Sequence, residues 1–229
     1  MNRMLPYIRV VITLLVVMVI IMTSIRLLLT PLFLEVEYRL PGFPSDQYGF
    51  NLEDRLKWSK ISVDYLIKNV DNSYLENFSL SESTPLYNER EISHMLDVKI
   101  LVGQMLICWY AILVILIGAG ILAWRTGWLS DYWSAISNGG WWTIGLIVTI
   151  LIGVAIGFNA LFTGFHRIFF EGDTWLFAYS DTLIRLFPIR FWSDAFIFIG
   201  VISGLAALGS GLLGRKMNKI NKDSSNPAN

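Results

Sequence analysis

Two histidines are the residues of this chain best suited to proton-transfer chemistry. His94 and His166 are the only histidines among 229 residues, and imidazole is the side chain that gains and loses a proton near neutral pH. The sequence contains no Walker-type phosphate loop, no His-Glu-x-x-His zinc motif and no Gly-x-Ser-x-Gly nucleophile motif. If the two rings meet, they can share a proton or divide the roles of general acid and general base.

Acidic residues lie close in sequence to both histidines. A carboxylate that bonds one ring nitrogen fixes the tautomer and raises the basicity of the other nitrogen. The acids considered for this orienting role are Glu91, Asp97, Glu171 and Asp173. For any single acid, a solvated surface charge is the simpler interpretation. Two histidines and one such acid would also make three metal ligands, but no spacing typical of a metal site supports this, so we expect no metal and no other cofactor.

Four apolar segments must position these residues. They cover residues 8–32, 100–123, 141–162 and 195–213, and about 20 apolar residues suffice to cross a bilayer. The chain is 54% apolar and only 16% charged, which is too few charges for a soluble domain. Because lipid cannot satisfy free backbone groups, spanning segments must be helical. The sequence therefore predicts an all-α membrane protein, a single integral membrane domain over residues 1–229 with four transmembrane helices.

The charge distribution predicts the side of the membrane on which each loop lies. Positive residues favour the cytoplasmic side, and Lys or Arg residues precede the first segment and follow the second and fourth segments. The N-terminus and the tail 214–229 are therefore expected inside, and the loops 33–98 and 163–194 outside. The first outer loop has twelve acidic against six basic residues, which suits an exported loop. Because the net charge is zero, no nucleic-acid partner is expected.

The long first outer loop is predicted to be partly helical. Asn51 can cap a helix, with two acids in the following turn. A second helix is predicted to begin near Glu89 and to run into the second apolar segment, which places His94 about one turn outside the bilayer core. His166 follows the third segment by about one turn, so antiparallel neighbours would bring both rings to one depth. A short interfacial helix is expected over residues 128–136.

The second outer loop is rich in large aromatic residues, which is unusual for a solvated loop. One interpretation is that it packs against the first outer loop and the lipid headgroups. The other, which we favour, is that it folds partly into the bilayer and lines a lipid-facing cavity, because irregular backbone is tolerated at membrane depth where it lines a cavity.

Two motifs around the histidines carry a resemblance to a known family. The first is His94-Met95-Leu96-Asp97-Val98-Lys99, which precedes a spanning segment. The second is Phe165-His166-x-x-Phe169-Phe170-x-x-Asp173-Thr174-Trp175, with Asp181-Thr182-Leu183-Ile184-Arg185-Leu186-Phe187-Pro188 and Phe191-Trp192 beyond it. With them the chain resembles, over nearly its whole length, the bacterial lipoprotein intramolecular transacylase (Lit) family of integral membrane proteins.

The resemblance implies an acyl transfer at the outer face of the bacterial cytoplasmic membrane. The substrate would be a diacylglyceryl lipoprotein held among membrane phospholipid. Its sn-2 acyl chain would move to the α-amino group of the N-terminal cysteine and give a lyso-form lipoprotein. The family's two histidines carry over onto His94 and His166, and a monomer is expected.

The resemblance leaves the supporting residues and two other functions open. Trp175, from the second motif, is a candidate for substrate binding. Arg167 and Arg185 are candidates for the donor that an oxyanion needs, and binding of lipid phosphate or loop acids is the alternative for both. A non-enzymatic lipid-binding or accessory membrane protein would tolerate the loss of both histidines. A metal-dependent membrane hydrolase would need a bound metal.

Overall fold

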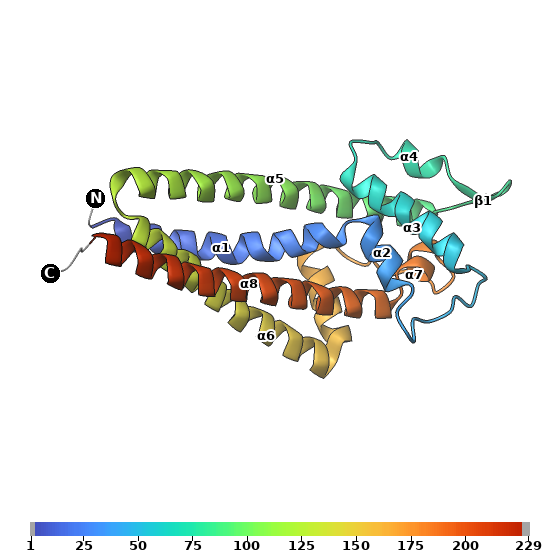
Figure 1. Cartoon of the computed structure of the whole chain (residues 1–229). Coiled ribbons are helices and arrows are strands. Elements are labelled where there is room, and N and C mark those ends of the chain that lie inside the picture. The colour runs from blue at the N-terminus through green and yellow to red at the C-terminus, as the bar shows by residue number, and fades with distance from the viewer. Residues whose placement is uncertain (1–2, 226–229) are drawn as a thin grey trace. The chain divides into compact units, whose positions relative to one another are not determined.

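The computed structural model describes residues 3–225, and these are mostly helical (Figure 1). The long helices in this part of the chain are α1 Leu5–Leu28, α5 Glu89–Thr126, α6 Leu129–Phe169 and α8 Ile189–Ser225. Each has a stretch that is long and apolar enough to cross a membrane. The short elements are α2 Pro31–Glu37, α3 Leu52–Ile67, α4 Ser73–Glu76, α7 Thr182–Leu186 and the antiparallel strands β1 Ser79–Ser81 and β2 Thr84–Pro85. The four apolar helices confirm the predicted helical class.

The first apolar segment is one helix only as far as Leu28, which differs from the prediction of a continuous span over 8–32. Thr30 has extended backbone angles (φ −142°, ψ 151°), and Pro31 begins the separate helix α2. Proline has no N–H, disfavours a helical residue before it and fits the first position of a helix. The chain therefore leaves α1 before the predicted end of the segment.

Residues 128–136 form no separate interfacial helix, so that prediction is wrong. Helix α6 begins at Leu129 and continues through them. Gly127 has φ +82°, a conformation that glycine adopts without strain, and the chain turns there from α5 into α6.

Gly140 does not interrupt α6 but allows close packing, because a Cβ at this position would stand 2.4 Å from the carbonyl oxygen of Ala207.

A first compact unit comprises residues 3–25, 106–152 and 198–225, all from the four long helices. Its buried core contains aliphatic side chains of α1 and α5 and small residues of α6 and α8, among them Ile12, Val16, Ile112, Leu116, Ala135 and Ala207. Buried polar groups pair between helices, as when Ser203 Oγ donates to Ser24 Oγ at 2.8 Å. Few residues of the apolar stretches are buried within the protein, which is the surface expected of helices surrounded by lipid.

A second compact unit comprises residues 26–105 and 153–197. Helix α3 begins as predicted, because Asn51 Oδ1 accepts from the Asp54 N–H (2.9 Å) and Asp54 Oδ2 accepts from the Asn51 N–H (3.1 Å). The core of this unit joins both predicted outer loops, and its buried members are Trp58, Tyr65, Leu75, Leu86, Tyr87, Met95, Leu183 and Leu186. Helix α7 of residues 163–194 thus packs against elements of residues 33–98, while the outer placement of both loops, their contact with headgroups and the lipid-facing cavity stay predictions.

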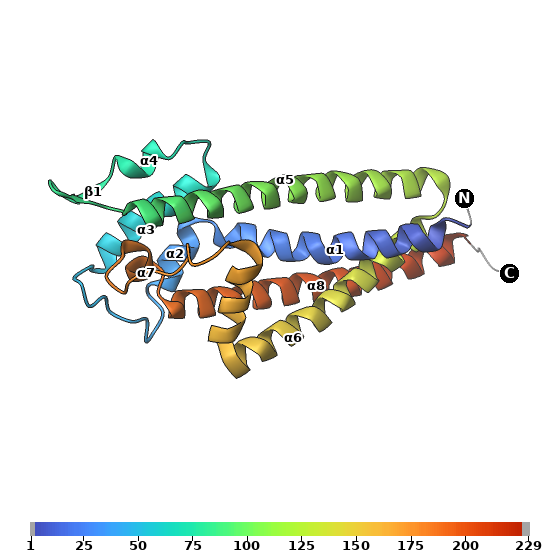
Figure 2. The same ribbon diagram turned by 180° about the vertical axis from the view of Figure 1, so that it is seen from behind.

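Helix α6 is interrupted at Gly157, where the third predicted segment was expected to be continuous. The backbone angles there, φ −169° and ψ 72°, are not helical, although the whole segment carries the single label α6 (Figure 2). The section after this point ends at Phe169 and belongs to the second unit. It carries His166, so the residue lies on a short helical section and not at the end of a straight span.

Candidate active site

His94 is held in the first turns of α5, whose start is fixed by a reciprocal cap. Asn88 Oδ1 accepts from the main-chain N–H of Glu91 (3.0 Å), and Glu91 Oε2 accepts from the main-chain N–H of Asn88 (2.8 Å). Because the cap determines where α5 begins, it also determines the face of the helix on which His94 lies. The predicted helix start near Glu89 is confirmed, and His94 is only 8% exposed.

His166 lies near the C-terminal end of α6, where the helix backbone sets its tautomer. Its Nδ1 is 2.9 Å from the carbonyl oxygen of Phe162, four residues earlier. A carbonyl oxygen only accepts hydrogen bonds, so Nδ1 carries the hydrogen and the neutral ring keeps its lone pair on Nε2. The orienting partner is therefore a main-chain carbonyl and not the predicted carboxylate.

The two imidazole rings lie together inside an aromatic enclosure. Their centroids are 6.3 Å apart and their planes differ by 21°, which confirms the predicted proximity. Phe170 packs against both rings, with its centroid 4.9 Å from that of His94 and 5.5 Å from that of His166. Phe177 packs on His94 at 5.4 Å, and Trp175 packs on His166 at 4.8 Å. The second outer loop thus supplies the rings that cover the pair.

Burial keeps both imidazoles neutral at pH 7. Both residues lie outside the apolar segments 100–123 and 141–162. Burial, and secondly the neighbouring His166, lower the pKa of His94 to about 4. Burial also lowers the pKa of His166, although its bond to the Phe162 carbonyl opposes this effect. His94 Nδ1 is buried without a hydrogen-bond partner among residues 3–225, so this nitrogen is available to a bound molecule.

Glu91, a candidate for orienting a ring, bonds neither imidazole and is not a solvated charge, but fastens residues 163–194 to α5. Its Oε1 accepts from the main-chain N–H of Leu183 at 2.7 Å, while Oε2 is held by the cap at Asn88. Burial raises the pKa of Glu91, and these two N–H donors oppose that effect. Because Leu183 lies in α7, Glu91 fixes the end of the loop whose aromatic rings cover the histidines.

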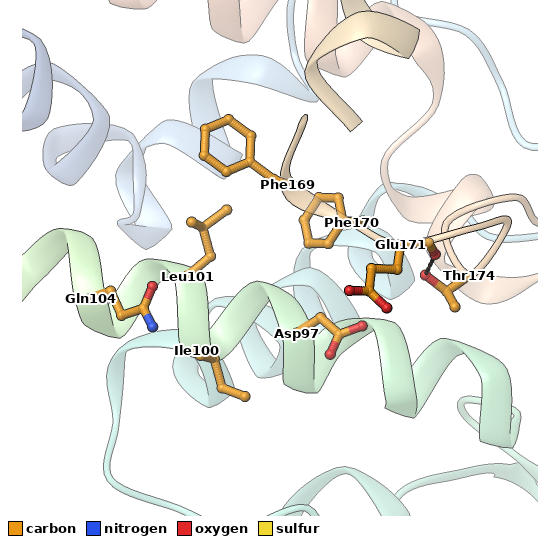
Figure 3. Close-up of a pocket in the computed structure, with 8 residues that line it drawn as sticks. All are labelled: Asp97, Ile100, Leu101, Gln104, Phe169, Phe170, Glu171 and Thr174. Carbon is orange, nitrogen blue, oxygen red and sulfur yellow. Dashed lines mark hydrogen bonds between the residues drawn. The ribbon is translucent and has the colours of Figure 1, made fainter. Parts of the chain in front are cut away.

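Two of the other predicted acids line a cavity of about 350 Å³ beside the histidine pair (Figure 3). Asp97 extends from α5, and Glu171 extends from the segment that follows α6. Phe170 forms part of the same wall and also contacts both imidazoles. The carboxylate of Asp173 is exposed and is not part of this lining. Within residues 3–225, no three His, Cys, Asp or Glu side chains gather as a group that could hold a metal ion.

The two predicted arginines differ in their surroundings. Arg185 Nη2 pairs with Asp46 Oδ2 at 3.0 Å, and its guanidinium carbon is 3.4 Å from the centroid of the Phe50 ring. Of the alternatives for Arg185, binding to a loop acid is therefore the one that forms. Arg167 is exposed, and its role in binding an oxyanion or lipid phosphate stays a prediction.

Sequence reasoning missed the individual rings that enclose the histidines. The loop was recognised as aromatic, but Phe170 and Phe177 were not assigned to the site. Part of the signal is local, because Phe162 and Phe170 lie four residues before and after His166, a spacing that brings side chains together on one face of a helix. The contact between Phe177 and His94 has no such signal, since the two residues are far apart in the sequence.

Sequence reasoning also missed a buried acid, Glu37, at the end of α2. Its side chain is fully buried, and neither carboxyl oxygen has a donor among the described residues. Burial, followed by the charge of Asp194, raises the pKa of Glu37 to about 8, while Arg190 opposes this effect. Arg190 forms an ion pair with Asp194. A pKa of about 8 keeps the proton on Glu37 at neutral pH.

The fold and the site together define a class: a helical protein with four helices apolar enough to cross a membrane and two buried, neutral histidines brought together. The family described as lipoprotein intramolecular transacylase Lit matches residues 10–192. The chain belongs to this family, which confirms the resemblance carried by the two histidine motifs. A relative from Aquifex aeolicus, an uncharacterized protein, is 30% identical over 203 residues, which cover 86% of this chain and 89% of the relative.

Solved structures support the same fold. The membrane-integral lipoprotein intramolecular transacylase Lit from Bacillus cereus superposes with a TM-score of 0.81 at 19% identity, covering 97% of this chain and 99% of the other. A form of that protein in which a histidine is mutated to arginine gives a TM-score of 0.75, also at 19% identity, over 97% of this chain and 96% of the other. At this level of identity the likeness shows a shared architecture.

Proposed function

We propose that this protein is an intramolecular O-to-N transacylase that acts on diacylglyceryl lipoproteins, with His94 and His166 as its acid and base. It moves the sn-2 acyl chain of the diacylglyceryl group to the α-amino group of the N-terminal cysteine. The observation that carries this proposal is the pair of neutral imidazoles, 6.3 Å apart between ring centroids, inside an aromatic enclosure. Membership of the transacylase family supports the choice of acyl transfer over other proton-transfer reactions.

The reaction requires removal of a proton before a bond can form. An α-ammonium group has a reference pKa of about 7.7–8.0, so a neutral imidazole is a suitable acceptor of its first proton. The amine nitrogen then attacks the carbonyl carbon of the sn-2 ester. As the carbon–oxygen bond to the glyceryl group breaks, the nitrogen loses its second proton and the glyceryl oxygen receives one. Donor and acceptor belong to one molecule, so much of the proximity is already present in the substrate.

The surroundings of the two rings favour a division of labour. His166 is assigned as the base, because its bond from Nδ1 to the Phe162 carbonyl leaves the lone pair on Nε2. His94 is assigned the proton-returning or orienting role, because its buried Nδ1 lacks a partner in residues 3–225. The rings of Phe170, Phe177 and Trp175 limit the access of water, which would compete with the amine for the ester.

The proposal includes a placement in the bacterial cytoplasmic membrane. Both chain ends lie inside, and the loops 33–98 and 163–194 lie on the outer face, as the distribution of positive residues favours. The protein works as a monomer among phospholipids, and the apolar second outer loop contacts the acyl chains of the substrate. His94 and His166 both lie in this outer part of the chain.

The test is the chemical state of lipoprotein N-termini in host cells that leave the α-amino group unmodified. The wild-type protein, His94→Ala and His166→Ala are expressed separately, and N-terminal lipopeptides are analysed by mass spectrometry. We expect N-acylated lyso-form product with the wild type and at least a ~100-fold loss with either variant, the typical contribution of acid–base catalysis. Glu82→Gln, an exposed acid remote from the site, serves as the control.

Two outcomes contradict the proposal. Lipopeptides that keep a free amine in cells with the wild-type protein would show that the protein does not catalyse the transfer. Full product formation by both histidine variants would show that the imidazoles are not its acid and base, and would favour a lipid-binding or accessory role. Thermal unfolding in detergent must show that each variant is folded before its loss of product is interpreted.

A further inference from the structure

The cavity beside the histidine pair combines two acids with apolar walls. On the α5 side it is lined by Asp97 and Leu101, and on the other side by Phe169, Phe170 and Glu171. The carboxyl groups of Asp97 and Glu171 point toward each other across it (Figure 3). Its volume of about 350 Å³ is enough for a small polar group and the first atoms of an attached chain.

The two carboxylates of this cavity have no cationic partner among residues 3–225. No hydrogen bond or ion pair engages the carboxylate of Asp97 or of Glu171 with another described residue. Neighbouring cations are bound elsewhere: Lys99 donates to the Val70 carbonyl and lies over a tyrosine ring, and Arg90 donates to the Asp173 carbonyl. Two facing like charges repel each other, so a cation placed between them would be favoured.

The cavity adjoins the proposed reacting groups. Phe170 lines it and also packs edge-on against the ring of His94, with 4.9 Å between centroids. That imidazole is more than nine-tenths buried, and its Nδ1 has no partner in the described chain. One phenylalanine ring therefore separates an acidic cavity from an imidazole that lacks a hydrogen-bond partner.

We propose that this cavity binds the α-ammonium group of the lipoprotein substrate, with Asp97 and Glu171 as its ion-pair partners. The assignment rests on the proposed function, because that reaction brings an N-terminal ammonium and its lipid chains to this site. A primary ammonium has three N–H donors and no acceptor, which suits two facing carboxylates, while Leu101, Phe169 and Phe170 contact the adjoining apolar part of the substrate.

This cavity holds the substrate before the reaction and takes no part in bond formation. Carboxylates stabilise the charged ammonium, which is not nucleophilic. The amine becomes reactive when it passes Phe170 and transfers one proton to the neutral imidazole of His166, which leaves an uncharged amine and an imidazolium. Asp97 and Glu171 thus increase the occupancy of the site by the correct end of the substrate, so their loss should raise KM more than it lowers kcat.

The test compares two lipopeptides that cannot react. In both, ether-linked alkyl chains replace the esters, so no acyl group can move; one keeps the N-terminal α-amino group and the other has hydrogen in its place. Binding to the detergent-solubilised full chain is measured by thermophoresis at low salt. We expect the wild type to bind the amine form about tenfold more tightly than the des-amino form. The variant Asp97→Asn/Glu171→Gln should bind the two forms within about twofold of each other.

A charge-matched control is Glu53→Gln/Glu82→Gln, which removes two exposed acids outside the cavity and should keep the wild-type preference. An unchanged amine preference in Asp97→Asn/Glu171→Gln, or its absence from the wild type, would overturn the assignment. If the double variant does not fold, the single variants are measured, and each should lose about half of the preference on a logarithmic scale. Because the probes are inert, an amine preference without N-acyl product in cells would reject the proposed function and keep this assignment.

Discussion

Glu37→Gln is expected to make the stability of the protein less sensitive to pH above neutrality. Glu37 is fully buried at the end of α2, and burial and Asp194 together raise its pKa from 4.5 to about 8. The folded protein therefore keeps this proton at pH values where the unfolded chain has lost it. Stability linked to this group is greatest in acid and declines as the pH rises from about 4.5 to about 8. Arg190, the guanidinium group paired with Asp194, keeps its charge across this range.

The size of the effect follows from the two pKa values. Linkage predicts a loss of roughly 2.5 kcal/mol of folding free energy between pH 6 and pH 9 from Glu37 alone. For a chain of this length, that corresponds to a fall in Tm of about 5–10 °C. Glutamine has nearly the same shape as glutamic acid and carries no titratable proton. The variant should therefore lack this part of the decline and unfold at a higher temperature than the wild type at pH 9.

The assay is thermal unfolding of purified protein in one detergent, followed by intrinsic tryptophan fluorescence from pH 6 to pH 9. Glu35→Gln is the matched control, because Glu35 lies on the same helix but is partly exposed and paired with Arg39. Its curve should parallel that of the wild type. Parallel curves for the wild type and Glu37→Gln would refute the reasoning, since the buried carboxyl would then not hold a proton that the unfolded chain releases.

Three further substitutions test other parts of the structure. Gly140→Ala should destabilise the fold by about 1–3 kcal/mol, because the added Cβ meets a main-chain oxygen of α8 at 2.4 Å. The effect should be seen as a lower Tm in detergent, and an unchanged Tm would contradict this close approach. Burial alone would raise the pKa of Asp46, but Arg185 and main-chain N–H donors outweigh burial and lower this pKa. The stability that depends on ionised Asp46 is therefore lost as the pH falls. Asp46→Asn should show a shallower loss of Tm than the wild type between pH 5 and pH 3. Trp175→Ala should uncover His166 and raise the pKa of this imidazole toward its ordinary value. The pKa is measured by NMR titration of the only two imidazoles in the chain. A pKa of His166 equal to that of the wild type would show that the tryptophan does not cover this ring.

Local features were predictable because their signals are adjacent in sequence. The helix cap at Asn51 and the helix start near Glu89 depend on residues three positions apart. The proximity of His94 and His166 followed from two apolar segments of similar length that end close to a histidine. Pro31 also carried a local signal for a helix break, but the apolar run around it was given more weight, and the predicted span was too long.

The partners of buried acids were not predictable, because they lie far apart in the sequence. Glu91 is one turn from His94, so local reasoning offered either that ring or solvent as its partner, yet one of its oxygens accepts from the N–H of Leu183, which is 92 positions away. Glu37 follows an apolar stretch that gives no sign of Asp194 in α8. The cost of leaving a buried polar group unpaired decides such partnerships, and it can be evaluated only when the surrounding elements are in place.

The exposed stretch from Glu171 to Thr174 has a consequence for how relatives of this chain can diverge. These side chains are exposed, whereas the neighbouring α7 is buried and bonded to Glu91. Exposed substitutions usually change stability by less than about 0.5 kcal/mol. Mutations here can therefore accumulate without loss of the folded protein, while α7 and the tautomer of His166 are held by main-chain bonds that do not depend on them. Apart from Glu171, which is proposed to bind the ammonium group that all clients share, this stretch can change under selection for new lipoprotein clients independently of selection for a stable fold.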